Sequence, residues 1–182
     1  TVVRKPAEQT PLTALLLGEL ALEAGMPGGV FNMVTGLGDA GAPLVEHPGV
    51  DKIAFTGSTE VGKAIVRASA GNLKKLSLEL GGKSPQVVFP DANLGDAAAA
   101  IAQGIFFNQG QTCTAGSRVY VHADCDDRLL DGIVEQAAKI KSGDGLDPEN
   151  DFCPLISQEQ WDRVSNYVAL GSKQGAKLIA GG

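Results

Sequence analysis

The alternation of short apolar segments with helix-patterned segments restricts the fold of this 182-residue chain more than any other feature. In the first half, strands are expected at residues 1–5, 29–34, 51–57 and 74–80, and helices at residues 11–25 and 58–70, with a short helix through Leu44 and Val45 after the turn glycines Gly36 and Gly38. Strands and helices that alternate at this interval form βαβ units, in which parallel strands are covered by helices. The sequence therefore predicts an α/β fold with a parallel sheet.

The double glycine Gly81-Gly82 is the expected boundary between this half and a second one. The second half continues the alternation, with strands expected at residues 85–89, 117–123 and 177–180 and helices at residues 93–110, 126–140 and 158–175. We expect the apolar residues of the last helix to anchor it in the core, namely Trp161, Val164 and Val168.

Composition argues against several classes of partner. A formal charge of −6 without any basic run disfavours nucleic-acid binding, because phosphates are neutralised by clustered lysine and arginine. The longest apolar stretch, residues 96–107, is too short and too rich in alanine to span a membrane, and the first residues lack the pattern of a signal peptide. We expect no nucleic-acid or membrane partner.

Cysteine and histidine are too few to build a metal site or a disulfide framework. The three cysteines, Cys113, Cys125 and Cys153, form no C-x-x-C pair, and the two histidines, His47 and His122, have polar or turn neighbours. An odd number of unpaired cysteines is typical of a reducing compartment, so we expect a cytoplasmic protein without a bound metal.

The stretch FTGSTEVGKA, residues 55–64, partly matches a triphosphate-binding loop. Gly57, Gly62 and Lys63 fit the pattern G-x-x-x-x-G-K, but Ala64 stands where a hydroxyl would hold Mg²⁺. A glycine turn between a strand and a helix exposes backbone N–H groups at the positive end of the helix, which favours an anion. The residues alone leave three interpretations: a structural turn, a dinucleotide pyrophosphate site and, least favoured, an ATP site.

The stretch FFNQGQTCTAGSR, residues 106–118, places Cys113 among small and polar residues. Structural cysteines usually have apolar neighbours, whereas a cysteine in a glycine-bounded turn can react, because backbone N–H groups stabilise a thiolate or an oxyanion. Cys113 is therefore a candidate nucleophile, and we interpret Cys125 and Cys153 as structural.

Glu79 is the candidate base for this thiol. It lies between Leu78 and Leu80 at the end of an expected strand, where partial desolvation would raise the pKa of its carboxyl group towards that of a useful base. The alternative is a carboxylate that ends a strand in water.

Four ordered motifs, KPAEQTPL, FTGSTEVG, LELGGKSP and FFNQGQTCTAGSR, together resemble those of the NAD(P)-dependent aldehyde dehydrogenase superfamily. The resemblance extends over the whole chain and corresponds to the middle third of a typical member. It implies that residues 1–80 are the C-terminal half of a Rossmann-like NAD-binding domain and that residues 81–182 begin the α/β catalytic domain. From the abrupt ends of the sequence we also expect an internal piece of a longer protein.

The resemblance implies NAD-dependent oxidation of an aldehyde to a carboxylic acid. Cys113 would attack the aldehyde to form a thiohemiacetal, and its backbone N–H would supply half of the oxyanion hole. Glu79 would be the general base that activates the thiol or the water that hydrolyses the thioester. The chemistry agrees, because a hydride leaves from the tetrahedral carbon that a thiol nucleophile creates.

The resemblance also implies a set of cofactor-binding residues. Lys5 and Glu8 would hold the adenosine ribose and Gly36 would line the adenine side, while the remaining positions, at and near the pyrophosphate, are Gly57, Ser58 and Leu80. A carboxylate at Glu8 suits free ribose hydroxyls and repels a 2′-phosphate, so NAD is expected in preference to NADP.

The expected partners are an aldehyde substrate and further copies of the chain, as a homodimer or homotetramer. The 182-residue chain alone is expected to be inactive, because the family's oxyanion-hole asparagine and nicotinamide-ribose glutamate lie outside it. Two alternatives remain: a P-loop nucleotide-binding protein, which Ala64 disfavours, and a non-catalytic relative, which would be expected to lack Cys113 or Glu79.

Overall fold

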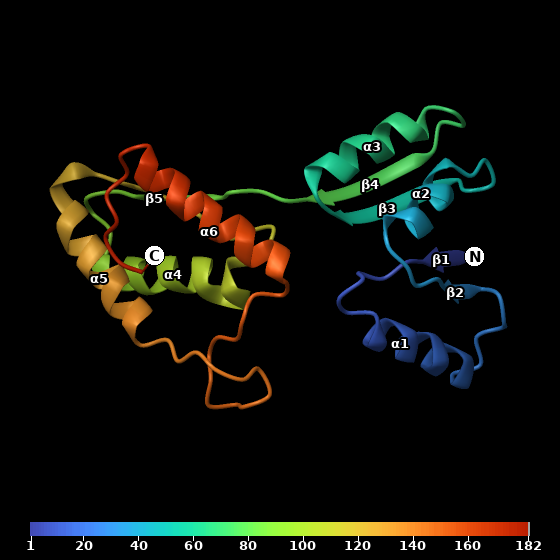
Figure 1. The fold of residues 1–182 in the computed structure, drawn as a ribbon, viewed down its shortest axis with the longest axis horizontal. Coiled ribbons are helices and arrows are strands. Elements are labelled where there is room, and N and C mark those ends of the chain that lie inside the picture. Colours follow the sequence, from blue (N-terminus) through green and yellow to red (C-terminus); the bar gives the residue numbers. More distant parts are fainter. Residues whose placement is uncertain (182) are drawn as a thin grey trace. The chain divides into compact units, whose positions relative to one another are not determined.

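The computed structural model describes residues 1–181, and the chain divides into two compact units, Thr1–Leu80 and Gly81–Gly182 (Figure 1). The division falls at the double glycine. Strands in the described residues form three two-stranded sheets, and each pair is parallel. The predicted α/β fold with parallel strands is confirmed.

The first unit contains two βαβ units joined by a short helix. Its elements are β1 (Val2–Arg4), α1 (Leu12–Glu23), β2 (Phe31–Met33), α2 (Gly38–Glu46), β3 (Lys52–Gly57), α3 (Thr59–Ser69) and β4 (Lys75–Leu80). β1 pairs with β2 and β3 pairs with β4. In each of these two βαβ units, the connecting helix lies against the strand that follows it: α1 against β2, and α3 against β4 (Figure 1).

The register of β3 and β4 brings their carboxyl ends to one edge. Thr56 pairs with Glu79, and Gly57 pairs with Leu80. Ligands of parallel α/β sheets bind beyond the carboxyl ends of the strands. Four of the predicted site residues therefore lie at or next to this edge: Gly57, Ser58, Glu79 and Leu80.

The second unit contains one βαβ unit followed by two helices. Its elements are β5 (Pro85–Val88), α4 (Leu94–Phe106), the 3₁₀ turn η1 (Phe107–Gly110), β6 (Arg118–Val121), the 3₁₀ turn η2 (Ala123–Cys125), α5 (Asp126–Ala138) and α6 (Gln158–Lys173). β5 pairs with β6.

The core of this unit lies between β5, α4 and α5. Val88, Ala98, Ile101 and Leu129 are buried together, and Leu129 is fully buried. A Cβ atom at Gly132 would lie 2.9 Å from the Cβ of Ala98, so the small residues allow α4 and α5 to approach closely. This contact fixes α4, whose C-terminal end leads into the Cys113 segment.

Two predictions for the second unit were wrong. Trp161, Val164 and Val168 are exposed, by 56%, 42% and 42%, so they do not anchor α6 in a core. Residues 177–180 do not form a strand, since no partner strand pairs with them within residues 1–181.

The helix expected over residues 93–110 is shorter than predicted. Its α-helical part ends at Phe106, and the backbone then turns left-handed at Asn108, Gln109 and Gly110. Asparagine and glycine tolerate this conformation, which stops the helix before Cys113.

Candidate active site

Lys5 joins the loops that follow β1 and β2. Its Nζ donates to the carbonyl oxygens of Pro6 and Gly36, both at 2.9 Å, and to Glu8 Oε1 at 3.2 Å. Because β1 and β2 are parallel, both loops leave the carboxyl ends of their strands. The structure therefore brings together three residues predicted from the sequence to bind the cofactor: Lys5, Glu8 and Gly36.

A hollow of about 120 Å³ lies beside these residues. Its lining combines backbone and apolar groups with one carboxylate, from Pro6, Ala7, Glu8, Pro11, Thr35, Gly36 and Leu37. A hydrogen bond with its own backbone, and then one from Lys5, lower the pKa of the Glu8 carboxyl group. Glu8 is therefore a charged acceptor at neutral pH.

Gly36 could not be replaced without strain. Its φ angle is +146°, and a Cβ atom there would lie 2.6 Å from the Cβ of Ala40. Glycine is the residue that adopts such an angle freely. It keeps the Gly36 carbonyl oxygen directed at Lys5.

The turn between β3 and α3 has the geometry of a helix cap. Ser58 Oγ accepts a hydrogen bond from the Val61 N–H at 3.2 Å, as an N-cap residue does. In the described chain, the N–H groups of Thr59 and Glu60 have no acceptor. These N–H groups lie at the positive end of the helix, where an anion is favoured.

Packing accounts for both glycines of the apparent triphosphate loop. A Cβ atom at Gly57 would overlap the Phe55 ring, and one at Gly62 would lie 2.7 Å from Leu80 Cδ2. Gly62 therefore lets α3 approach β4, so the match to G-x-x-x-x-G-K needs no ATP to explain it.

Glu79 is exposed, so the expected desolvation was wrong. Along β4, Leu76, Leu78 and Leu80 are half-buried on one side of the strand, while Ser77 and Glu79 are exposed on the other. Alternation along a strand places neighbours on opposite faces, so the flanking leucines cannot cover the carboxylate. The apolar residues next to Glu79 in the sequence therefore do not indicate a buried carboxylate.

Cys113 is exposed in a short turn closed by a hydrogen bond from Ala115 N–H to the Thr112 carbonyl oxygen at 3.3 Å. Its own backbone N–H has no acceptor among residues 1–181. A free thiol beside a free N–H group is the arrangement needed to stabilise an oxyanion on a carbon bonded to the sulfur.

The turn that contains Cys113 is held by hydrogen bonds from residues that the sequence interpretation missed. Ser84 N–H donates to the Ala115 carbonyl oxygen at 3.2 Å, and Gly116 N–H donates to that of Gly104 at 3.0 Å. Gln86 Nε2 donates to the Gly116 carbonyl oxygen at 2.9 Å. Only Gly116, inside the motif, gave a signal in the sequence; the other contacts are long-range.

The other cysteines differ from Cys113 in environment. Cys125 is 2% exposed and Cys153 is half-buried, and all three thiols are free. No cluster of potential metal ligands occurs in the described residues, and no helix among them is long and apolar enough to cross a membrane.

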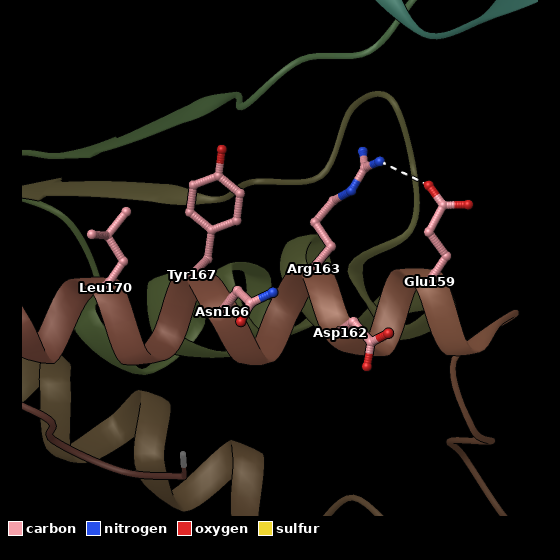
Figure 2. A pocket seen from close by; sticks show the side chains of 6 residues that line it. All are labelled: Glu159, Asp162, Arg163, Asn166, Tyr167 and Leu170. Carbon is pink, nitrogen blue, oxygen red and sulfur yellow. Dashed lines mark hydrogen bonds and ion pairs between the residues drawn. The ribbon is translucent and has the colours of Figure 1, made fainter.

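A second hollow, of about 390 Å³, runs along α6 and contains none of the predicted site residues (Figure 2). All of its lining residues belong to this one helix: Glu159, Asp162, Arg163, Asn166, Tyr167 and Leu170. Arg163 and Glu159 form an ion pair at 3.1 Å along it. One helix face provides no opposing wall for a ligand, so we assign it no function.

The aldehyde dehydrogenase family matches the chain over residues 1–182. The chain belongs to the aldehyde dehydrogenase family. An aldehyde dehydrogenase of Enchytraeus buchholzi is 49% identical over 184 residues, and human retinal dehydrogenase 2 is 50% identical over 184 residues. Both alignments cover 100% of this chain, and 37% and 36% of the two relatives, respectively. The resemblance stated from the four motifs is confirmed.

Solved structures of aldehyde dehydrogenases share the fold. An NAD⁺ complex of the aldehyde dehydrogenase from Bacillus cereus matches with a TM-score of 0.96 and 49% identity over 100% of this chain and 37% of that one. A structure described as an NADP-dependent enzyme of E. coli matches with a TM-score of 0.96 and 43% identity, over 100% of this chain and 38% of that one. The chain thus spans little more than a third of the length of the relatives and solved structures that it matches.

Proposed function

We propose that this chain is part of an NAD-dependent aldehyde dehydrogenase, in which it holds the adenosine side of the cofactor and carries the nucleophilic thiol. The observation that carries the proposal is the exposed Cys113 thiol beside its own free backbone N–H. The reaction would convert an aldehyde to a carboxylic acid.

The residues around Lys5 fit the ribose of NAD. Glu8 supplies a charged acceptor for two hydroxyl groups, and the Lys5 ammonium is held beside it at 3.2 Å. The same carboxylate repels a 2′-phosphate, so we propose that NAD is preferred to NADP. The B. cereus relative is described as an NAD⁺ complex, which supports this choice, whereas the E. coli one is described as NADP-dependent.

The free N–H groups at the start of α3 would face the pyrophosphate. Gly57 and Ser58 form the turn in front of them, and Leu80 pairs with Gly57 at the same edge. Glu60 adds a negative charge in the first helical turn, so these N–H groups and the helix dipole must outweigh it.

The thiol of Cys113 would add to the aldehyde carbon. The carbonyl oxygen takes the negative charge and accepts a hydrogen bond from the Cys113 N–H, which lowers the energy of the tetrahedral thiohemiacetal. Bound NAD supplies the acceptor for the hydride that leaves this carbon. Water then displaces the sulfur from the resulting thioester, which releases the acid and regenerates the thiol.

Glu79 would take the proton from the thiol or from the attacking water. It ends β4 with its carboxylate exposed, so the side chain is free to receive a proton. We also propose that Thr1–Leu80 belongs to the cofactor domain and Gly81–Gly182 to the catalytic domain of a cytoplasmic homo-oligomer.

The test uses the full-length protein and an aldehyde panel, with NADH formation as the readout. Cys113→Ala should abolish turnover while NAD binding and melting temperature stay unchanged, and Glu79→Gln should lower kcat by about a hundred-fold or more. The 182-residue chain alone should show little or no turnover. A Cys113→Ala variant that still forms NADH would refute the mechanism.

A further inference from the structure

A strained turn precedes the thiol. Asn108 and Gln109 have φ angles of +50° and +57°, and Gly110 follows with +70°. Left-handed backbone is unfavourable for residues with side chains, so such a turn persists only where its surroundings hold it. Contacts with the rest of the protein must therefore stabilise the backbone immediately before Cys113.

Two side chains, one in this turn and one directly after it, reach a segment that is more than 40 residues away in the sequence. Gln111 Oε1 accepts a hydrogen bond from the Ile156 N–H at 3.1 Å, and Gln111 Nε2 donates to Gln109 Oε1 at 3.2 Å. Gln109 Nε2 in turn lies 3.3 Å from Cys153 Sγ. With its amide rotated by half a turn, Gln109 instead accepts from the Cys153 N–H at 3.3 Å. Either way, Gln109 and Gln111 contact residues 153–156.

Residues 153–156 are themselves fixed at both ends. On one side, Phe152 N–H donates to the Lys141 carbonyl oxygen at 3.0 Å, and Gly143 N–H donates to that of Phe152 at 2.9 Å. On the other side, Ser157 caps α6 by accepting from the Gln160 N–H at 3.2 Å. The segment can therefore hold the strained turn in place.

We infer that Gln111 is a positioning residue for the thiol: its side-chain amide fastens the Asn108–Gly110 turn to residues 153–156 and so fixes the Cys113 backbone two residues later. This inference rests on the proposed function only for its effect on turnover. The Cys113 N–H would be displaced from the developing oxyanion if the amide were lost, and small displacements of reacting groups cost about a hundred-fold in rate.

Two substitutions separate the amide from the size of the side chain. Gln111→Met keeps the length and removes all three hydrogen bonds of the side chain, including the one that Nε2 donates to the Asn108 carbonyl oxygen at 3.5 Å. Gln111→Glu keeps the acceptor for the Ile156 N–H, and the rotated Gln109 amide can donate to its second oxygen. Gln103→Met is the matched control, because Gln103 is exposed on α4 and its side chain makes no hydrogen bond within the described chain.

The experiment measures kcat, the KM for NAD and the hydrogen–deuterium exchange of residues 107–116 in the full-length protein. Gln111→Met should lower kcat by about ten- to a hundred-fold, leave the KM for NAD within about two-fold, and speed exchange in this segment. Gln111→Glu should restore most of kcat and of the protection, and Gln103→Met should change neither.

The kinetic measurements and the exchange measurement separate the possible failures. Unchanged exchange in Gln111→Met would overturn the inference, as would a Gln111→Glu variant as impaired as Gln111→Met. A parent protein that oxidises no aldehyde would refute the proposed function, while exchange would still decide the role of Gln111. If Gln111→Met does not fold, Ile156→Pro removes the same hydrogen bond from the donor side, and normal exchange and turnover in that variant would overturn the inference.

Discussion

The side chain of Leu80 fills the space that a side chain at Gly62 would need, with Cδ2 2.7 Å and Cδ1 2.8 Å from the position of a Cβ atom. Leu80 ends β4, and Gly62 lies in the first turns of α3. The last glycine of the apparent triphosphate loop therefore serves the packing of helix on strand. The absence of a side chain at Gly62 therefore allows the N-terminal part of α3 to approach the end of β4 closely.

Gly62→Ala should lower the stability of the full-length protein by about 1–3 kcal/mol, because a methyl group forced against Leu80 overpacks a close contact. Gly71→Ala is the control, since a Cβ atom there meets nothing within 4 Å. Thermal unfolding compares the two variants. Equal melting temperatures would contradict the role given to Gly62.

Gly36→Ala should weaken NAD binding more than it weakens the fold. A Cβ atom would clash with Ala40 and the φ angle of +146° would become strained, so the backbone would shift and move its carbonyl oxygen away from Lys5. Calorimetric titration with NAD should show an affinity at least about ten-fold lower. Unchanged affinity would show that this loop does not contact the cofactor.

The sequence predicted the order of the elements well, because periodicity and turn residues are local signals. The family resemblance also assigned Lys5, Glu8 and Gly36 to one site, and the structure brings these three together although more than 30 residues separate the first from the last. The sequence could not predict which face of a strand a side chain occupies, nor which residues far apart in the chain come into contact. The exposure of Glu79 depends on which side of β4 it occupies, and the support of Cys113 depends on Gln86 and Ile156, which no local pattern connects to it.

Glu8 should make the stability of the first unit depend on pH. Its hydrogen bonds hold the carboxyl pKa below its ordinary value of 4.5, so the unfolded chain binds the proton more tightly than the folded one. The stabilisation is present above pH 4.5 and is lost as the pH falls through the lowered pKa. The difference in melting temperature between the wild type and Glu8→Gln should thus be largest at neutral pH and shrink in acid.

The size of this difference should be small, because the Glu8 side chain is 37% exposed and solvent screens its contact with Lys5. Glu8→Gln should also narrow the preference for NAD over NADP, measured as the ratio of kcat/KM values, since the repulsion of a 2′-phosphate is removed. A wild-type protein that prefers NADP would contradict the cofactor assignment.

Cys113 should react with iodoacetamide before the other two cysteines do. It is exposed, whereas Cys125 is 2% exposed and Cys153 is half-buried against Gly145 and Gln109. Peptide mass spectrometry of the folded protein should show labelling of Cys113 at least about ten-fold faster than that of Cys125. Unfolding in urea should equalise the rates. Faster labelling of Cys125 or Cys153 in the folded protein would contradict the environment assigned to Cys113.

Gln86 and Gly116 should behave as a coupled pair. A Cβ atom at Gly116 would lie 2.5 Å from Gln86 Cδ, so Gly116→Ala should destabilise the turn that follows Cys113 by about 1–3 kcal/mol. Gln86→Ala removes the hydrogen bond to the Gly116 carbonyl oxygen and should cost about 1–3 kcal/mol.

The double variant should be less destabilised than the sum of the two single variants, because shortening Gln86 makes room for the new methyl group. Residues in direct contact typically couple by about 0.5–3 kcal/mol, which urea unfolding of the four proteins resolves. Turnover should follow the same pattern if the Gly116 carbonyl helps to fix the Cys113 turn. Strict additivity in both measurements would contradict the coupling between Gln86 and Gly116.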